Sequence, residues 1–420
     1  MANENKGNVL AIAIMFMLFF MIAFVTNFAG SMGIIVKNQF GASNMASQFG
    51  SAANFFAYLF MGIPGGLILK RKGYKFTALL AVGVGLAGLA VQLASGYVAS
   101  FAVYVTGAFV AGFSMCLLNL VVNPLLNTLG GGGNKGNQLV QFGCSLNSIG
   151  ATLAPVILGY LIGGEVAKAK VADAAPALWI AIGIFVVAFL VLAFSAIPEP
   201  HMETAEEKAN RTPVLGDIKE TLKFRHFSLG ALAIFTYIVI ESGIPNMANL
   251  YMTTEKIGDA QNPAFVGAAV AGSVVAVYWF CMMIGRLLGG AVGAKVSSRM
   301  QITFCSSLGI VLMLATMFTP VQMVTICGKS FPLAMVFMAL CGLCTSVMWG
   351  GIFNMAAEGL GKYVPMGSGI FMAMVVGGLM LPVQGMIADK IGILNSYWFT
   401  IGLLAYVLFY ALIGSRVSKK

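Results

Sequence analysis

Carboxylates are the side chains of this sequence best suited to chemistry inside an apolar environment. No Asp or Glu occurs between Glu4 and Glu165, a stretch with five long apolar runs, and Glu241 alone lies in the middle of such a run. An ionisable group inside hydrocarbon is costly and marks sites that bind or pass protons and ions. Burial disfavours the charged form of a carboxylate, which suits a group that exchanges a proton or binds a cation. We expect Glu241 to be such a group; the structural alternative is a glutamate hydrogen-bonded between helices. Gly243 and Pro245 beside it suggest that its helix is broken there.

Amide side chains form a second set of candidates, because several amides around one cavity would suit a ligand with many hydroxyl groups. The residues that we expect to line such a cavity are Asn27, Asn54, Asn119, Gln141, Asn147, Asn246, Trp349 and Asn354. The amides would hydrogen-bond hydroxyl groups, and Trp349 would stack on an apolar ring face. Hydrogen bonding between helices is the structural alternative for each amide. We favour it for Asn123, because Pro124 frees a backbone carbonyl one turn earlier.

Arg286 is a basic residue inside an apolar run, and we assign it to a gate or to the anchoring of a loop, with Glu358 as a possible partner. The alternative is a contact with the ligand, in which Arg286 and Lys37 would neutralise a carboxylate. The seven cysteines lack metal-ligand spacing, and the two histidines lie in or beside one polar loop. We therefore expect no catalytic residue and no metal site, and the chain is not expected to be an enzyme.

These side chains must be positioned by elements that fit a membrane. The sequence is 59% hydrophobic and 9% charged, against about 25% charged residues in soluble domains. A helix that crosses a bilayer needs about 20 mostly apolar residues, and strand-like alternation is absent. Twelve runs meet this description: 8–29, 46–69, 76–96, 100–127, 139–163, 177–197, 228–252, 264–291, 301–319, 332–356, 367–388 and 393–415.

The Lys and Arg residues are distributed unequally between the two ends of these runs. If the N-terminus lies in the cytoplasm, seventeen fall on the cytoplasmic side and six on the other, which is the usual bias of membrane proteins. We therefore expect both termini in the cytoplasm. The first run is too long for a signal-peptide core, and we expect it to be a retained span.

One polar interruption divides the twelve runs into two sets of six. Residues 198–226 hold six of the fourteen acidic residues, and we expect a cytoplasmic linker there, with a short amphipathic helix near 214–224. The predicted domains are a six-helix bundle at 1–197, the linker at 198–226 and a six-helix bundle at 227–420. Two parallel six-helix halves with such a link are typical of the major facilitator architecture. The predicted fold class is an all-α membrane protein with that fold.

Several local patterns, in matching order, resemble those of the fucose–proton symporter family of the major facilitator superfamily. They are residues 62–75 (IPAGxxxxxxxYK in the family), Asn123-Pro124 followed by Leu-Gly (ANPxxxxLG), 147–150 (FNSxG), Tyr278-Trp279 with 283–286 (YWxxMxxGR), and 352–362 with 367–369 (IFxxxxxGLGK and GSG). Each match is short, and together they extend over most of the chain.

The resemblance implies a carrier of monosaccharides such as fucose, glucose and galactose, coupled to protons or, in some members, to sodium. In the L-fucose permease of this family, an Asn and an Asp of span one and a Glu of span four serve the sugar and the proton. The corresponding positions here are Asn27, Gly30 and Asn119, so the first-half proton carboxylates are absent. A glutamine of the family falls on Cys144, with Gln141 one turn away.

We therefore predict a secondary transporter that imports a monosaccharide or sugar derivative across the bacterial inner membrane by alternating access. Glu241 matches a Tyr-x-x-x-Glu pattern of glucose/galactose-type relatives, and it would couple transport to a proton or a sodium ion. The alternatives are an uncoupled sugar facilitator, a carrier of an anionic sugar acid or other small solute, and a sugar sensor, which would need a signalling domain that we do not expect after Lys420. We expect a monomer whose partners are the sugar and the lipid bilayer, with no cofactor besides the co-transported ion. We expect no nucleic acid partner, despite the net charge of +10.

Overall fold

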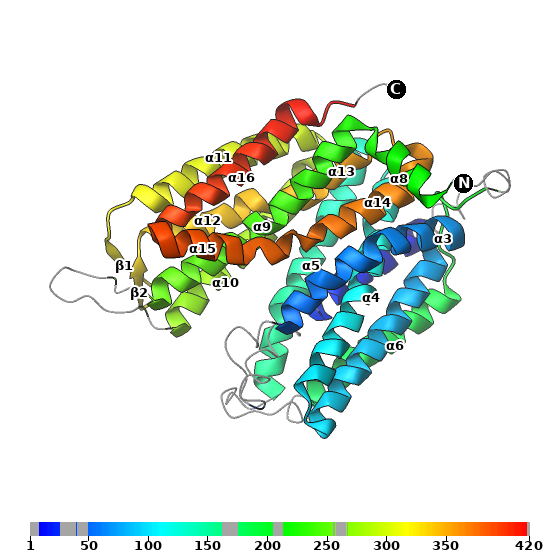
Figure 1. Cartoon of the computed structure of the whole chain (residues 1–420), viewed down its shortest axis with the longest axis horizontal. Helices are drawn as coiled ribbons and strands as arrows, with labels where there is room; N and C mark the ends of the chain where they lie inside the picture. Colours follow the sequence, from blue (N-terminus) through cyan, green and yellow to red (C-terminus); the bar gives the residue numbers. More distant parts are fainter. Residues whose placement is uncertain are drawn as a thin grey trace. The chain divides into compact units, whose positions relative to one another are not determined.

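The computed structural model describes residues 8–25, 39, 49–161, 175–204, 213–254, 257, 266 and 268–417. These residues are mostly helical (Figure 1), and each of the twelve apolar runs overlaps a described helix. Ten described stretches are long and apolar enough to cross a membrane, and one of them, Ala52–Val98, has 47 residues and overlaps two of the runs. The predicted all-α membrane fold is therefore confirmed, and the number of twelve spans stays a prediction.

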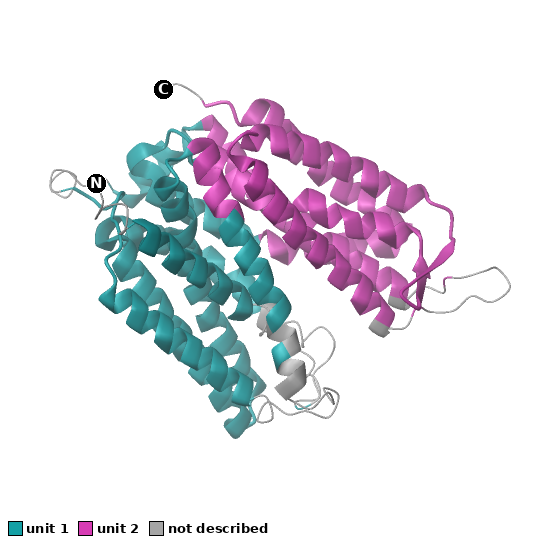
Figure 2. Ribbon diagram, turned by 180° about the vertical axis from the view of Figure 1, so that it is seen from behind, with its two compact units in different colours: residues 1–132, 142–224, 357–376 teal, residues 133–141, 225–356, 377–420 magenta. Residues whose placement is uncertain are grey.

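The chain forms two compact units (Figure 2). Unit 1 consists of residues 1–132, 142–224 and 357–376, and unit 2 of residues 133–141, 225–356 and 377–420. The predicted domain boundaries follow the order of the chain, whereas these units group residues by their contacts in space, and the boundaries stay a prediction.

The described part of unit 1 is built from helices that pack along one another. Its elements are the helix Asn8–Val25, α3 (Phe49–Val98), α4 (Phe101–Leu129), α5 (Gly133–Leu161, of which 133–141 group with unit 2), α6 (Ala175–Phe194), α8 (Val214–Leu222), the 3₁₀ helix η1 (Gly361–Tyr363) and α14 (Val364–Ala373). The amphipathic helix expected near 214–224 is confirmed as α8.

Glycine lets α3 and α14 approach at backbone distance. A Cβ atom on Gly62 would lie 2.6 Å from the carbonyl oxygen of Gly369, and a Cβ on Gly66 would lie 2.6 Å from that of Pro365. Any larger side chain would have to move a helix backbone. Small residues at such crossings are typical of helix packing in membranes.

The polar residues after α6 bind the turn in the middle of α3. Gly73 interrupts the helical geometry of α3 with φ of 83°, and the Glu199 carboxylate accepts hydrogen bonds from the backbone N–H groups of Tyr74 and Lys75, the second at 2.9 Å. These N–H groups begin the next helical segment, where an acidic cap is favourable. Lys70 adds an ion pair with Asp217 of α8 at 2.6 Å. The linker acids thus hold the turn between the two helical segments of α3.

Unit 2 combines long helices with two interrupted ones. Its elements are α9 (Arg225–Thr254), α10 (Ala268–Gly293), α11 (Ser298–Phe318), β1 (Met323–Ile326), β2 (Lys329–Pro332), α12 (Ala334–Thr345), α13 (Met348–Ala357), α15 (Leu381–Ile391), the 3₁₀ helix η3 (Leu394–Ser396), α16 (Tyr397–Phe409) and the π-helix η4 (Tyr410–Gly414). The 3₁₀ helix η2 (Met374–Met380) joins α14 to α15.

The helix breaks do not lie where the sequence suggested. Gly243 and Pro245 suggested a break beside Glu241, but α9 continues through both. That prediction was wrong, because a proline removes one helical hydrogen bond and neighbouring groups can replace it. The interruptions lie instead at Ser346 and Val347, between α12 and α13, and at η2.

A two-stranded antiparallel hairpin in unit 2 was not expected from the sequence. β1 pairs with β2, with Met323 opposite Pro332 and Ile326 opposite Lys329. The two turn residues, Cys327 and Gly328, both have positive φ, at 50° and 72°. Such turns match the twist of a hairpin. Strands of four residues are too short to produce a recognisable alternation in the sequence.

Candidate functional site

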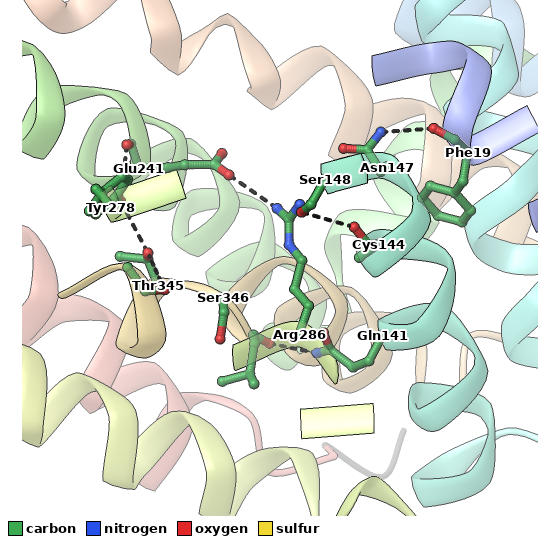
Figure 3. Close-up of polar contacts among 12 residues, drawn as sticks. Phe19, Gln141, Cys144, Asn147, Ser148, Glu241, Tyr278, Arg286, Thr345 and Ser346 are labelled. Carbon is green, nitrogen blue, oxygen red and sulfur yellow. Dashed lines mark hydrogen bonds and ion pairs between the residues drawn. The ribbon is translucent and has the colours of Figure 1, made fainter. Parts of the chain in front are cut away.

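Glu241 lies on α9 and forms an ion pair with Arg286 of α10 (Figure 3). Arg286 Nη2 is 3.2 Å from Glu241 Oε1, and the side chains are 9% and 17% exposed. Both charges lie within helices of membrane length. A pair in such surroundings is sustained because each group compensates the charge of the other. Arg286 thus pairs with Glu241. Glu358, its suggested partner, is exposed.

Tyr278 of α10 joins the same cluster through its hydroxyl group. The hydroxyl is 3.1 Å from the backbone carbonyl oxygen of Glu241 and 3.0 Å from Thr345 Oγ1 at the end of α12. Tyr278 and Thr345 are both buried, with 0% and 1% of their surfaces exposed. Two side chains of α10 therefore hold Glu241, one at its carboxylate and the other at its backbone.

An aromatic pair lies on the same helix face one turn away. Tyr237 precedes Glu241 by four residues on α9, and its ring centroid is 6.3 Å from that of Trp349 on α13. Tyr237 is fully buried, whereas Trp349 is partly exposed. A partly exposed indole beside polar groups offers an apolar face on which a ring can stack.

Gly285 allows α10 to lie close to the break between α12 and α13. A Cβ atom on Gly285 would be 2.3 Å from Ser346 Oγ. On the other side of the break, the Gln141 amide nitrogen donates to the carbonyl of Val347 at 3.0 Å. Gln141 and Val347 belong to the same unit, so this amide bridges α5 to the interrupted helix. The break is thus lined by polar contacts from two helices.

The amides of unit 1 form a separate hydrogen-bonded cluster on α4 and α3. The Asn119 side-chain nitrogen donates to the Tyr58 hydroxyl at 2.9 Å and to the Met115 carbonyl at 3.0 Å. Asn123 donates to the backbone carbonyl of Asn119 at 2.9 Å and to its side-chain oxygen at 3.2 Å. Asn123 therefore makes a structural contact within its own helix. Its partner in these hydrogen bonds is Asn119, whereas the carbonyl that Pro124 frees is that of Leu120. Asn119 satisfies its polar groups in the same cluster.

The remaining candidates are spread over both units. Asn54 is buried, and its side-chain oxygen has no hydrogen-bond partner among the described residues. Asn147 donates to the Phe19 carbonyl at 3.1 Å, and Asn354 donates to Ser298 Oγ at 2.9 Å. Asn246 is exposed. Asn27, with Gly30 and Lys37, lies outside the described residues. The structure thus brings Glu241 and Arg286 together in unit 2 and places Trp349 against Tyr237, one turn from Glu241. It ties Asn147 and Asn354 into helix contacts.

Tyr58 and Thr345 take part in these clusters without having been singled out from the sequence. Each is a hydroxyl group in an apolar run, and many such residues bond only to their own helix. The available signal was spacing, because Tyr58 follows Asn54 by four residues, on the same helix face. Among the described residues, no group of three or more His, Cys, Asp or Glu could hold a metal ion.

Membrane-length helices that bury an ion pair define a multi-pass membrane protein with a polar centre, as in transporters. The protein-family model of the Major Facilitator Superfamily matches residues 14–380. The chain belongs to this superfamily, whose members are membrane transporters rather than enzymes.

Curated relatives match over nearly the whole chain. The glucose/galactose transporter of Brucella abortus is 28% identical over 99% of this chain and 96% of that protein. The putative glucose/galactose transporter of Helicobacter pylori is 27% identical over 99% of both chains. The L-fucose-proton symporter of Escherichia coli is 20% identical over 93% of this chain and 90% of its own length. The predicted resemblance to this group is confirmed.

The fold also matches a solved transporter. The crystal structure of the Escherichia coli fucose:proton symporter FucP superposes with a TM-score of 0.81 at 18% identity, covering 99% of this chain and 100% of that chain. This likeness confirms the predicted major facilitator fold.

Proposed function

We propose that this protein is a secondary transporter that imports a monosaccharide or sugar derivative across the bacterial inner membrane by alternating access. The observation that carries the proposal is the full-length match to relatives named glucose/galactose transporter. The polar centre in unit 2 supports it, because it offers an ion pair and, one helical turn from Glu241, the ring of Tyr237 against a partly exposed indole. Such groups suit a ligand with hydroxyl groups and an apolar ring face. We propose a monomer with both termini in the cytoplasm, organised as two bundles, 1–197 and 227–420, with a linker at 198–226.

The residues that we propose to bind the sugar are those expected from the sequence. Trp349 would stack on the sugar ring, and the amides would bond hydroxyl groups; these are Asn27, Asn54, Asn119, Gln141, Asn147, Asn246 and Asn354. Asn54 has the strongest support among the amides of unit 1, because its buried side-chain oxygen has no partner in the structure. An unmade hydrogen bond of this kind is costly until a donor occupies it.

Glu241 is the proposed coupling group. A proton or a sodium ion that binds this carboxylate must compete with Arg286, which lies 3.2 Å away. Loading of the ion would release Arg286, and loss of the ion would restore the pair. Such an exchange gives the carboxylate two discrete states, as coupling requires.

The ion pair also favours one alternative, an uncoupled facilitator. Arg286 already neutralises Glu241, so the carboxylate does not need an ion to be compensated. The same pairing argues against a carrier of an anionic sugar acid, because the positive charge of Arg286 is already balanced.

Transport by purified protein in proteoliposomes tests these proposals. D-glucose, D-galactose and L-fucose are offered with a proton gradient, with a sodium gradient or with neither. We expect accumulation of at least one sugar with one gradient, and we expect Glu241→Gln to abolish accumulation while sparing counterflow. Asp389→Asn, which neutralises an exposed carboxylate with no proposed role, is the matched control and should leave both unchanged.

Each outcome decides a separate point. Counterflow of none of the three sugars would contradict the proposed substrate class. Counterflow without accumulation under any gradient would establish the uncoupled facilitator. Normal accumulation by Glu241→Gln would contradict the coupling role. If both Asn119→Ala and Asn27→Ala left uptake unchanged, the proposed first-half site would be wrong.

A further inference from the structure

Pro245 leaves the backbone carbonyl of Glu241 without its helical partner. In a helix, the carbonyl of residue 241 would accept from the N–H of residue 245, but proline has no N–H. The α9 helix nevertheless continues through this position. A buried carbonyl without a donor is costly, so another group must supply one.

The Tyr278 hydroxyl lies where this missing donor is needed. It is 3.1 Å from the Glu241 carbonyl oxygen, and because a carbonyl only accepts, the hydroxyl donates. The Thr345 hydroxyl, 3.0 Å away, is then placed to donate to the Tyr278 oxygen. A chain of hydroxyl groups thus runs from the turn of Glu241 to the last residue of α12, beside the break at Ser346 and Val347.

The same helix, α10, supplies both contacts to Glu241. Arg286 binds the carboxylate and Tyr278 binds the carbonyl. A shift of the Glu241 backbone relative to α10 would therefore change the distance between the carboxylate and Arg286. The position of the backbone controls the strength of the ion pair.

We propose that Tyr278 is the positioning residue of Glu241, whose hydroxyl replaces the N–H that Pro245 lacks and so holds the carboxylate against Arg286. The importance of this role for transport rests on the proposed function, in which Glu241 couples transport to an ion. Tyr278 does not contact the transported ion in this account. It acts through Glu241 and links that residue to the interrupted helix α12–α13.

Tyr397 provides a matched control within the same turn. Its hydroxyl also donates to a carbonyl of α9, that of Ile244, at 2.9 Å, and its side chain is also fully buried. The carbonyl of Ile244, however, has the N–H of Ala248 four residues ahead. Restoring an N–H at position 245 should therefore relieve the loss of the Tyr278 hydroxyl and leave the loss of the Tyr397 hydroxyl unchanged.

The first experiment measures unfolding of the purified protein in mixed detergent for Tyr278→Phe and Tyr397→Phe, each with and without Pro245→Ala. We expect Tyr278→Phe to lower the ratio of folded to unfolded protein about tenfold with proline present, as for an unsatisfied buried carbonyl. With alanine at position 245 we expect a loss below about twofold. Tyr397→Phe should cause the same loss of stability with proline and with alanine at position 245. Equal losses for Tyr278→Phe in both backgrounds would overturn the proposal.

The second experiment measures the position of the carboxylate and does not depend on transport. Dicyclohexylcarbodiimide modifies protonated carboxyl groups in apolar surroundings, and mass spectrometry gives the rate at Glu241. We expect Tyr278→Phe to raise this rate several-fold, because the carboxyl leaves Arg286, and Tyr397→Phe to leave it within about twofold of wild type. An unchanged rate in Tyr278→Phe would overturn the positioning role, even if Pro245→Ala prevented folding.

These two readouts separate the positioning role from the proposed function. Failure of sugar transport with the expected unfolding and labelling results would leave Tyr278 as the positioning residue and contradict only the substrate. Normal sugar transport with the opposite unfolding and labelling results would support the proposed function and contradict the positioning role of Tyr278.

Discussion

The ion pair between Glu241 and Arg286 predicts an unequal response to removal of its two partners. Glu241→Gln leaves a buried guanidinium, which stays charged at every accessible pH. Arg286→Met leaves a carboxyl group, which can take up a proton and become neutral. We therefore expect Glu241→Gln to destabilise the protein more than Arg286→Met. The double variant should lose less stability than the sum of the losses in the two single variants.

The magnitude follows from the geometry. At 3.2 Å and an effective dielectric constant of about 20, the attraction is about 5 kcal/mol before the cost of removing both charges from water. Breaking a fully buried pair costs about 3–5 kcal/mol. Because the pair has a single hydrogen bond and Glu241 keeps 17% exposure, we expect about 2–3 kcal/mol for Glu241→Gln and a coupling energy of about 2 kcal/mol.

Reversible unfolding of the purified single and double variants measures this coupling. Arg299→Met, which removes an exposed charge, is the control and should change stability by less than about 0.5 kcal/mol. Strictly additive single and double variants would refute the reasoning, as would an Arg286→Met variant that loses more stability than Glu241→Gln.

Three further predictions concern unit 1. Gly73→Ala should cost about 1–3 kcal/mol in unfolding experiments, since φ is 83° and a Cβ would lie 2.3 Å from the Glu199 carboxylate; a neutral effect would contradict this. Burial lowers the pKa of His201 from its ordinary value of 6.5, so the unfolded chain takes up this proton first and stability should fall as the pH drops through 6.5. A His201→Gln variant should lack that pH dependence, and an unchanged dependence would contradict the assignment. Gly62→Val should lower the melting temperature in a thermal-shift assay, because its Cβ would lie 2.6 Å from a carbonyl oxygen of α14. Gly83→Ala is the control, because a Cβ at this position would have no atom within 4 Å. Equal shifts in melting temperature for the two variants would refute the argument.

Much of the fold was predictable because hydrophobic length is a property of short segments. Each apolar run of about 20 residues overlaps a described helix, since a backbone in hydrocarbon must satisfy its own hydrogen bonds. The linker helix near 214–224 followed from its amphipathic pattern. Helix interruptions were not predictable in this way. Pro245 looked like a break, but the Tyr278 hydroxyl from another helix replaces the missing donor.

The candidate site was predictable in its residue types more than in its pairings. A lone carboxylate in an apolar run marks Glu241 without reference to any other residue. Its partner Arg286 lies 45 positions away. Nothing local in the sequence shows whether Arg286 pairs with Glu241 or with Glu358. Asn119 and Asn123 share a helix face through their spacing of four, whereas the contact of Asn119 with Tyr58 joins two helices across 61 positions.

The sequence by itself determined that this protein spans a membrane, that its ordered motifs resemble those of the fucose–proton symporter family, and that it keeps Glu241 in mid-span with no Asp or Glu between Glu4 and Glu165. These properties are local, because hydropathy, charge and motif spacing act within one segment. Only the tertiary structure decided that Glu241 is compensated by Arg286 and held at its backbone by Tyr278. Charge compensation and hydrogen-bond replacement act between helices far apart in sequence, so they depend on which helix faces are packed together.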